Sequence, residues 1–108
     1  MKDSITADEF TAQEGVADWR VADDVASARF HTASFATGVE FVVAIGRDAD
    51  AADHHPDVDL RYDHVDVRLT SHDVGGLSRR DVELARKIIE AARTLGAQPD
   101  PDFEEDES

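Results

Sequence analysis

The sequence predicts an α+β domain in which helices pack on one face of a four-stranded antiparallel sheet, in the order α-β-β-α-β-β-α. Two segments in the second half alternate apolar and polar residues with a period of two, which is typical of half-buried strands. Two longer segments repeat apolar residues at helical spacing. Short polar turns separate these elements, so neighbouring strands should pair antiparallel and the helices should gather on one side.

The first third of the chain is predicted to form a short helix and two strands. Thr6 and Glu9 have the spacing of a capping box, which indicates that a helix begins there. A first strand is expected over 19–22 and a second over 28–32. The polar turn at 23–24 lies between them.

The middle of the chain is predicted to form a long helix. Ser34 is a suitable N-cap, and the helix should run through about Asp50. Pro56 disfavours the helical conformation of the residue before it, so the helix should end by that point. One stripe at helical spacing contains Phe35, Val39, Val42, Val43 and Gly46.

The second half is predicted to form a hairpin followed by a final helix. One strand places Val58, Leu60 and Tyr62 on a common face, and the next does the same with Val65, Val67 and Leu69. A second capping-box spacing over 78–81 opens the last helix. Its apolar stripe contains Val82, Ala85, Ile88, Ile89, Ala92 and Leu95.

Composition limits the classes of function. The 108 residues suffice for one modest core, and with no cysteine the chain has neither disulfides nor thiolate chemistry. No apolar run approaches the roughly 18 residues of a membrane helix, and the first residues lack a hydrophobic signal segment. We therefore expect a soluble, cytoplasmic protein.

The charge is strongly negative. There are 25 acidic and 11 basic residues, for a net charge of −14. This balance argues against a nucleic-acid backbone or an anionic membrane as a direct partner. Because salt screens such self-repulsion, we expect a halophilic source; the alternative is an acidic protein from an ordinary cytoplasm.

Three of the five histidines lie close together in the sequence and beside carboxylates. His54 and His55 precede Pro56, and His72 follows the last predicted strand, on the same face as Thr70 by strand parity. Asp50 lies four residues before His54, so a helix would place the two on one face. Histidine gains and loses protons near neutral pH, and this cluster is therefore a candidate for acid–base catalysis.

Other interpretations of the same residues stay open. Asp81 fits an ordinary capping residue, although one carboxylate can cap a helix and orient a histidine. Three histidines could bind zinc, but the usual short spacing between zinc-binding histidines is missing. His31 and His64 are expected to have no role, and Trp19 fits either the core or a pocket wall.

The pattern resembles the pterin-4a-carbinolamine dehydratases, also called 4a-hydroxytetrahydrobiopterin dehydratases. Their signature is an acidic residue, three further residues, His-His-Pro, an aromatic residue, another histidine and an aspartate. The corresponding residues here are Asp50, His54, His55, Pro56, Tyr62, His72 and Asp81. The resemblance covers about residues 5–96 and includes a tryptophan at the first strand, Trp19. Asp50 stands where Glu is frequent and Ser71 where Thr is common.

The resemblance implies dehydration of a 4a-hydroxytetrahydropterin to the quinonoid dihydropterin, without metal or cofactor, by a homodimer or homotetramer. It implies three catalytic residues: His54, His55 and His72. Substrate contacts would come from Pro56, Ser71, Asp73, Val74 and Trp19. Asp50, Asp53 and Asp81 would orient these groups.

Two further expectations concern the chain as a whole. Residues 1–98 should form the dehydratase-like domain, and residues 99–108 an acidic, disordered tail. The rival to catalysis is a role as a dimerisation or assembly partner of another protein, because some relatives act in that way. Such a role would not need all three histidines.

Overall fold

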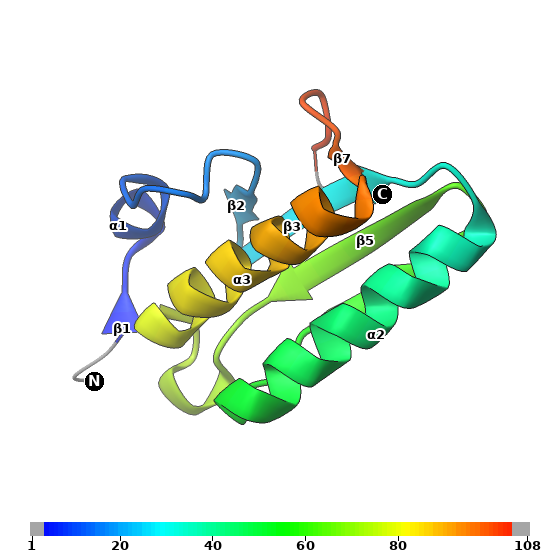
Figure 1. The fold of residues 1–108 in the computed structure, drawn as a ribbon. Helices are drawn as coiled ribbons and strands as arrows, with labels where there is room; N and C mark the ends of the chain where they lie inside the picture. The colour runs from blue at the N-terminus through cyan, green and yellow to red at the C-terminus, as the bar shows by residue number, and fades with distance from the viewer. Residues whose placement is uncertain (1–3, 105–108) are drawn as a thin grey trace.

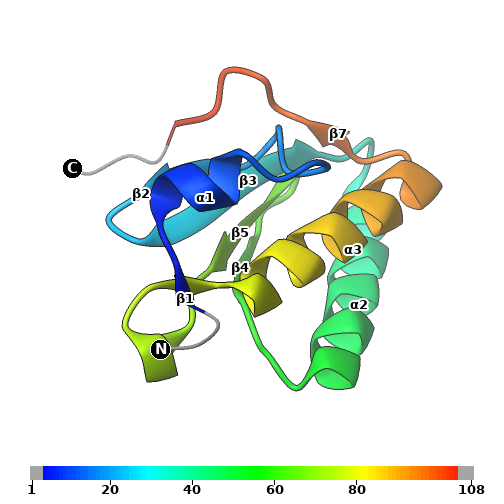
Figure 2. The ribbon, with the colours of Figure 1, turned by 90° about the vertical axis from the view of Figure 1, so that its left-hand side faces the viewer.

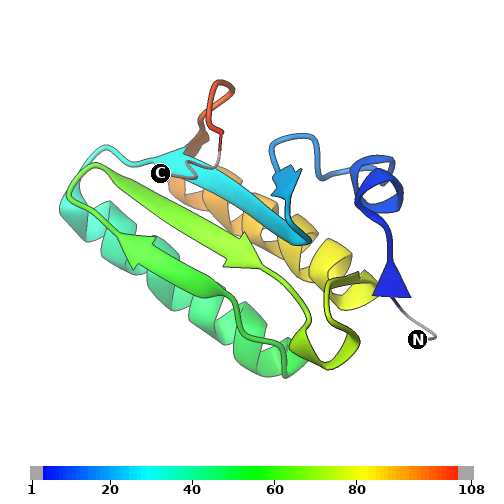
Figure 3. The same cartoon turned by 180° about the vertical axis from the view of Figure 1, so that it is seen from behind.

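The computed structural model describes residues 4–104, in which two long helices cover one face of an antiparallel sheet (Figure 1). From behind, the sheet lies in front of both helices (Figure 3). The predicted fold class is confirmed, but the strand count differs. In the described part of the chain the main sheet has five strands rather than four, and a separate sheet has two.

The elements run along the chain in a simple order. They are β1 (Ser4–Ile5), α1 (Ala7–Thr11), β2 (Arg20–Ala22), β3 (Val25–His31), α2 (Phe35–Ala52), β4 (Asp57–Leu60), β5 (His64–Leu69), the 3₁₀ turn η1 (His72–Val74), β6 (Leu77–Ser78), α3 (Arg79–Leu95) and β7 (Gln98–Pro99).

The main sheet is a pair of hairpins joined through its two central strands. Its order is β2-β3-β5-β4, every pairing is antiparallel, and β7 pairs with β3. The first hairpin turns at Asp23 and Asp24, which both have positive φ, as a two-residue type I′ turn requires. The second hairpin joins β4 to β5, as the alternating pattern predicts.

The core lies between the sheet and the helices. Phe30 of β3 packs edge-on against Phe41 of α2 and Trp19, with ring centroids 5.0 and 6.2 Å apart. The predicted stripe of α3 faces this core. Its buried members are Val82, Ala85, Ile88, Ile89 and Ala92.

Helix α2 buries a different stripe from the one that the sequence singled out. Its buried residues are Gly38, Phe41, Ile45 and Ala49. Phe35, Val39 and Val43 are exposed instead, by 53, 40 and 47%. The helix therefore carries two apolar faces, and only one of them is covered within the chain.

The end of α2 is set by Asp53 and not by Pro56. Asp53 has a left-handed backbone (φ 51°), and its N–H donates to the carbonyls of Ala49 and Asp50. The chain leaves the helix there and enters β4 at Asp57. The end of α2 and the start of α3 lie at the same end of the helical layer (Figures 1 and 2).

The first residues of the acidic C-terminal segment pair with the main sheet. Gln98–Pro99 forms β7 on β3, and the N–H of Asp100 donates to the carbonyl of Arg29 at 2.8 Å. Phe103 lies under the Arg29 guanidinium, 5.0 Å from ring centroid to Cζ. The expected disorder is therefore wrong for residues 99–104, because backbone pairing and this cation–π contact hold them. Residues 105–108 lie outside the described part.

Candidate functional site

His54 is the buried member of the histidine cluster. It follows the left-handed residue that ends α2, and its N–H donates to the carbonyl of Ala49 at 3.1 Å. Its side chain is 10% exposed, and its Nε2 lies 2.6 Å from Oδ1 of Asp81. This short contact joins residues 27 positions apart, at the end of α2 and the start of α3.

Asp81 both caps a helix and holds a histidine. Its side chain is fully buried, and its Oδ2 accepts hydrogen bonds from the N–H of Ser78 (2.9 Å) and the hydroxyl of Ser71 (2.8 Å). The first of these bonds is part of the capping box that opens α3. Asp81 therefore caps α3 and contacts a histidine at the same time, because its two oxygens have different partners.

Ser71 and Ser78 complete the buried network. Their hydroxyl oxygens lie 2.7 Å apart, and Ser71 is 1% and Ser78 0% exposed. Ser71 was expected to contact the substrate, but the structure directs its hydroxyl inward to Asp81. Sequence reasoning missed Ser78 beyond its capping role. The available signal was the second capping box itself, whose acidic member lies in the histidine signature.

His55 points to solvent and pairs with Asp50. Its Nε2 lies 3.0 Å from Oδ1 of Asp50, and the two side chains are 60 and 82% exposed. The predicted pairing of Asp50 with His54 is wrong, because the left-handed turn at Asp53 ends the helix before His54 and changes which ring faces the carboxylate.

His72 lies in η1, beside Ser71, and is exposed. The parity argument that placed it on a strand face is wrong, since β5 ends at Leu69 and the chain turns into a 3₁₀ helix. In residues 4–104 no hydrogen-bond partner of the His72 ring is found. The ring is thus available to solvent at the loop that also carries Ser71.

Asp73 is held by an arginine. Both of its oxygens accept from Nη2 of Arg80, at 2.8 and 3.0 Å. This hydrogen-bonded guanidinium lowers the pKa of the Asp73 carboxyl from its ordinary value. Asp73 therefore tethers η1 to the first turn of α3, while Val74 is half-buried at the end of the same loop.

The other predicted site residues take structural positions. Trp19, expected to contact the substrate, is 2% exposed in the core, where burial of its large ring is favourable. Asp53 ends α2, and Pro56 is half-buried just before β4. His31 pairs with Asp100 at 3.1 Å and His64 with Asp63 at 2.7 Å.

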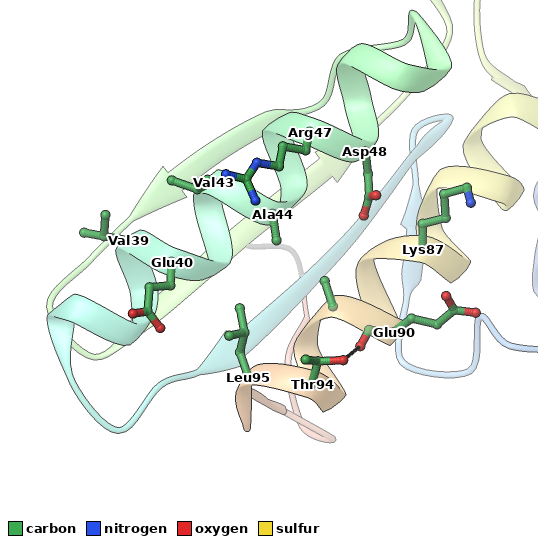
Figure 4. A pocket seen from close by; sticks show the side chains of 11 residues that line it. Val39, Glu40, Val43, Ala44, Arg47, Asp48, Lys87, Glu90, Thr94 and Leu95 are labelled. Atoms are coloured by element: carbon green, nitrogen blue, oxygen red, sulfur yellow. Dashed lines mark hydrogen bonds between the residues drawn. The ribbon is translucent and has the colours of Figure 1, made fainter.

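The larger hollows of the surface lie elsewhere. A groove of about 650 Å³ runs between α2 and α3 (Figure 4), and a polar hollow of about 510 Å³ lies on the sheet around Arg29. Neither is lined by His54, His55 or His72. We place the candidate site at the histidines, because histidine is the side chain best suited to proton transfer near neutral pH and the residues that line the groove include none.

Three comparisons with known proteins bear on the family of this chain. A sequence model described as pterin 4 alpha carbinolamine dehydratase matches residues 3–91. A relative from Natronomonas pharaonis is 39% identical over 85% of this chain and 99% of its own. One from Nocardia farcinica is 39% identical over 77% of this chain and 87% of its own. Both are provisionally named pterin-4-alpha-carbinolamine dehydratase.

Solved structures agree on the fold. A protein from Brucella melitensis, described as a transcriptional coactivator/pterin dehydratase, superposes with a TM-score of 0.72 and 29% identity over 82% of this chain and 97% of its own. A pterin dehydratase-like RuBisCO assembly factor of the alpha-carboxysome shares the fold, with a TM-score of 0.58, 16% identity, and 68 and 86% of the two chains covered. With its fold, its histidine register and the match over residues 3–91, the chain belongs to the pterin 4 alpha carbinolamine dehydratase family.

Proposed function

We propose that this protein dehydrates a 4a-hydroxytetrahydropterin, such as 4a-hydroxytetrahydrobiopterin, to the quinonoid dihydropterin and water, and so serves pterin recycling. The observation that carries the proposal is the buried pair of His54 and Asp81, with the two exposed imidazoles of His55 and His72 at the same end of the helices. Family membership supplies the substrate class.

The reaction needs one proton acceptor and one proton donor. The N5–H bond breaks as a base takes the proton, a C4a=N5 double bond forms, and the C4a–O bond breaks as an acid protonates the departing hydroxyl. The products are the quinonoid dihydropterin and one water, and solvent returns the two catalytic groups to their starting protonation states. No electrons are exchanged and both proton transfers are assigned to histidines, so the proposal includes no redox cofactor and no metal. Paired imidazoles suit both steps near neutral pH.

Each histidine has a proposed role. His54 takes the N5 proton, since a buried carboxylate beside its ring stabilises the imidazolium that forms. His72 protonates the hydroxyl from the exposed loop η1. His55, whose Nε2 lies 3.0 Å from Oδ1 of Asp50, binds and orients the pterin, and Pro56 and Val74 also contact the pterin.

Alanine variants test these roles. His54→Ala and His72→Ala should each lower kcat for carbinolamine dehydration by about 10²-fold or more, the usual contribution of a general acid or base. His55→Ala should chiefly raise KM. His64→Ala, a histidine on β5 paired with Asp63, is the matched control and should keep the wild-type rate. Wild-type rates for both His54→Ala and His72→Ala would contradict the proposal.

We also propose that the enzyme is a homo-oligomer formed through the outer face of α2. Phe35, Val39 and Val43 lie one helical turn apart and form an exposed apolar stripe. Val39, Val43 and Leu95 also line the groove between α2 and α3 (Figure 4). Exposed apolar surface of this kind marks an interaction site.

The charges beside this stripe favour a second copy as the occupant. Glu40 and Arg47 flank the groove and have no ion-pair partner in residues 4–104. If two α2 helices pack antiparallel about a twofold axis between Val43 and Ala44, Glu40 of each copy faces Arg47 of the other, because both lie equally far from the axis.

The oligomeric state can be measured by sedimentation at micromolar concentration in molar KCl. Val43→Asp should lower the observed mass toward that of the 11.8 kDa monomer, because it buries an unpaired charge in the interface. Val58→Asp, at an exposed valine on β4, is the control and should leave the mass unchanged. The rival role, as a non-catalytic partner of another protein, would show the apolar stripe binding that protein without turnover.

A further inference from the structure

The hydrogen bonds around His54 distinguish its two ring nitrogens. Every hydrogen bond of the ring involves Nε2, which lies 2.6 Å from Oδ1 of Asp81 and 3.4 Å from the hydroxyl oxygen of Ser71. Nδ1 has no partner in the described part of the chain, and it is not among the buried unpartnered polar atoms found there. Nδ1 is therefore the nitrogen on the accessible side of the ring.

The hydrogen bonds that Asp81 accepts favour placing the proton of the short contact on His54 rather than on the carboxylate. Oδ2 of Asp81 already accepts two hydrogen bonds, from the N–H of Ser78 and the hydroxyl of Ser71. The carboxylate also lies in the first turn of α3, where the helix dipole favours negative charge. These contacts stabilise the ionised form, which can only accept a hydrogen bond at Oδ1.

The two serines fix the direction of the network. Ser71 donates its single hydroxyl proton to Asp81, so the 2.7 Å contact between the two hydroxyls has Ser78 as donor to Ser71. The oxygen of Ser78 in turn accepts the N–H of Arg80 at 3.2 Å. The donors in this series of hydrogen bonds all point toward the Asp81 carboxylate, and the Nε2–H of His54 completes the set.

We propose that Asp81, Ser71 and Ser78 are positioning residues that hold neutral His54 as the Nε2–H tautomer, so that it acts as the base through Nδ1. This inference rests on the proposed dehydratase function and assigns the direction of proton transfer within it. A ring whose Nε2 already carries the proton can only accept at Nδ1. His54 therefore takes the N5 proton at its accessible nitrogen, and the acid must be a different group, for which His72 is available.

The tautomer can be observed directly on the unmodified protein. In ¹⁵N-labelled protein, at a pH high enough that the His54 ring is neutral, long-range ¹H–¹⁵N spectra should show a protonated Nε2 and an unprotonated Nδ1. The His54→Gln variant assigns the signals. A protonated Nδ1 in an active enzyme would overturn this inference and leave the dehydratase function intact.

Kinetics of the network variants provide the second test. Asp81→Asn should lower kcat by at least 10²-fold with little change in KM, because an amide can donate to Nε2 and favour the wrong tautomer. Ser71→Ala should lower kcat less, and Ser71→Thr, which keeps the hydroxyl, should restore it. Asp100→Asn, which removes the half-buried carboxylate facing His31 at 3.1 Å, is the matched control and should leave kcat unchanged.

The outcomes separate the two proposals. An Asp81→Asn variant that keeps both the wild-type kcat and the Nε2–H tautomer would overturn the positioning role of Asp81. A wild-type protein that shows the Nε2–H tautomer but no turnover would instead overturn the dehydratase function, and with it the catalytic use of Nδ1.

Discussion

At the scale of single residues, the protein places carboxylates beside titratable or basic side chains in very different surroundings. Asp81 meets His54 in full burial, whereas Asp50 meets His55 in solvent. Water screens the second pair but not the first, so only the buried contact is expected to fix a ring in place. A contact between histidine Nε2 and an aspartate oxygen thus orients the ring where it is buried and is only a loose surface contact where it is exposed.

The residues of the candidate site could be named from the sequence, but their hydrogen-bond partners could not. The spacing of His54, His55, His72 and Asp81 follows from the sequence. The contact between His54 and Asp81 spans 27 positions and depends on how the end of α2 meets the start of α3. A local pattern predicts only neighbours along one helix, which is why Asp50 was assigned to the wrong histidine.

The Asp73–Arg80 pair predicts a specific acid dependence of stability. The pKa of Asp73 is lowered in the folded state, so its contribution is fully present above the unfolded value of about 3.9 and is lost as pH falls through the folded pKa. The Tm of the wild type should therefore exceed that of Asp73→Asn at pH 6, and the difference should vanish as the pH falls toward 2.

The control for this prediction is Asp57→Asn. Asp57 is exposed on β4 and makes no ion pair in residues 4–104. Its removal should change Tm by a similar, small amount at both pH values. A Tm difference for Asp73→Asn that persists at pH 2 would show that the carboxylate does not act through its charge.

At the scale of elements, the two long helices show what periodicity can and cannot predict. Helix α3 has one apolar stripe and a polar remainder, so its buried face was predictable. Helix α2 is apolar on two sides, and nothing in the pattern says which side meets the sheet. Strand β7 was missed because two residues, one of them proline, carry no alternation at all.

The two glycines within α2 give a matched prediction. A Cβ added at Gly46 would meet no atom within 4 Å, whereas one added at Gly38 would come within 2.9 Å of Cδ1 of Leu60. Gly46→Ala should raise the free energy of unfolding by about 0.5–1 kcal/mol through helix propensity. Gly38→Ala should raise the free energy of unfolding by less, or lower it, because Leu60 must move to make room for the added Cβ.

Denaturant unfolding of the two variants measures this difference. The buried position of Gly38 near β4 and β5 is what separates it from the exposed Gly46. Equal gains at both positions would contradict the close packing of α2 against Leu60.

At the scale of the whole molecule, charge sets the conditions in which the fold is stable. A net charge of −14 on 108 residues produces strong self-repulsion at low ionic strength. No helix in residues 4–104 is long and apolar enough to cross a bilayer. Because salt screens the repulsion between the negative charges, the Tm should rise from low salt to molar KCl, as expected for a protein adapted to high salt.

The salt response can be attributed to charge by neutralising two exposed acidic residues and one half-buried one. A variant with Glu14→Gln, Asp18→Asn and Asp57→Asn changes the net charge from −14 to the less negative −11, since each change removes one negative charge. Its Tm should rise less with KCl than that of the wild type. A wild-type Tm that stays flat or falls in KCl would contradict the halophilic prediction.

The most direct test of the central claim is the rate at which the wild-type protein dehydrates 4a-hydroxytetrahydropterin. The carbinolamine is generated in situ and followed by absorbance as the quinonoid product forms, at several KCl concentrations. We predict a rate well above the spontaneous one, rising with KCl and reduced by about 10²-fold or more in His54→Ala. A rate equal to the spontaneous one at every KCl concentration, with a folded protein, would contradict the account.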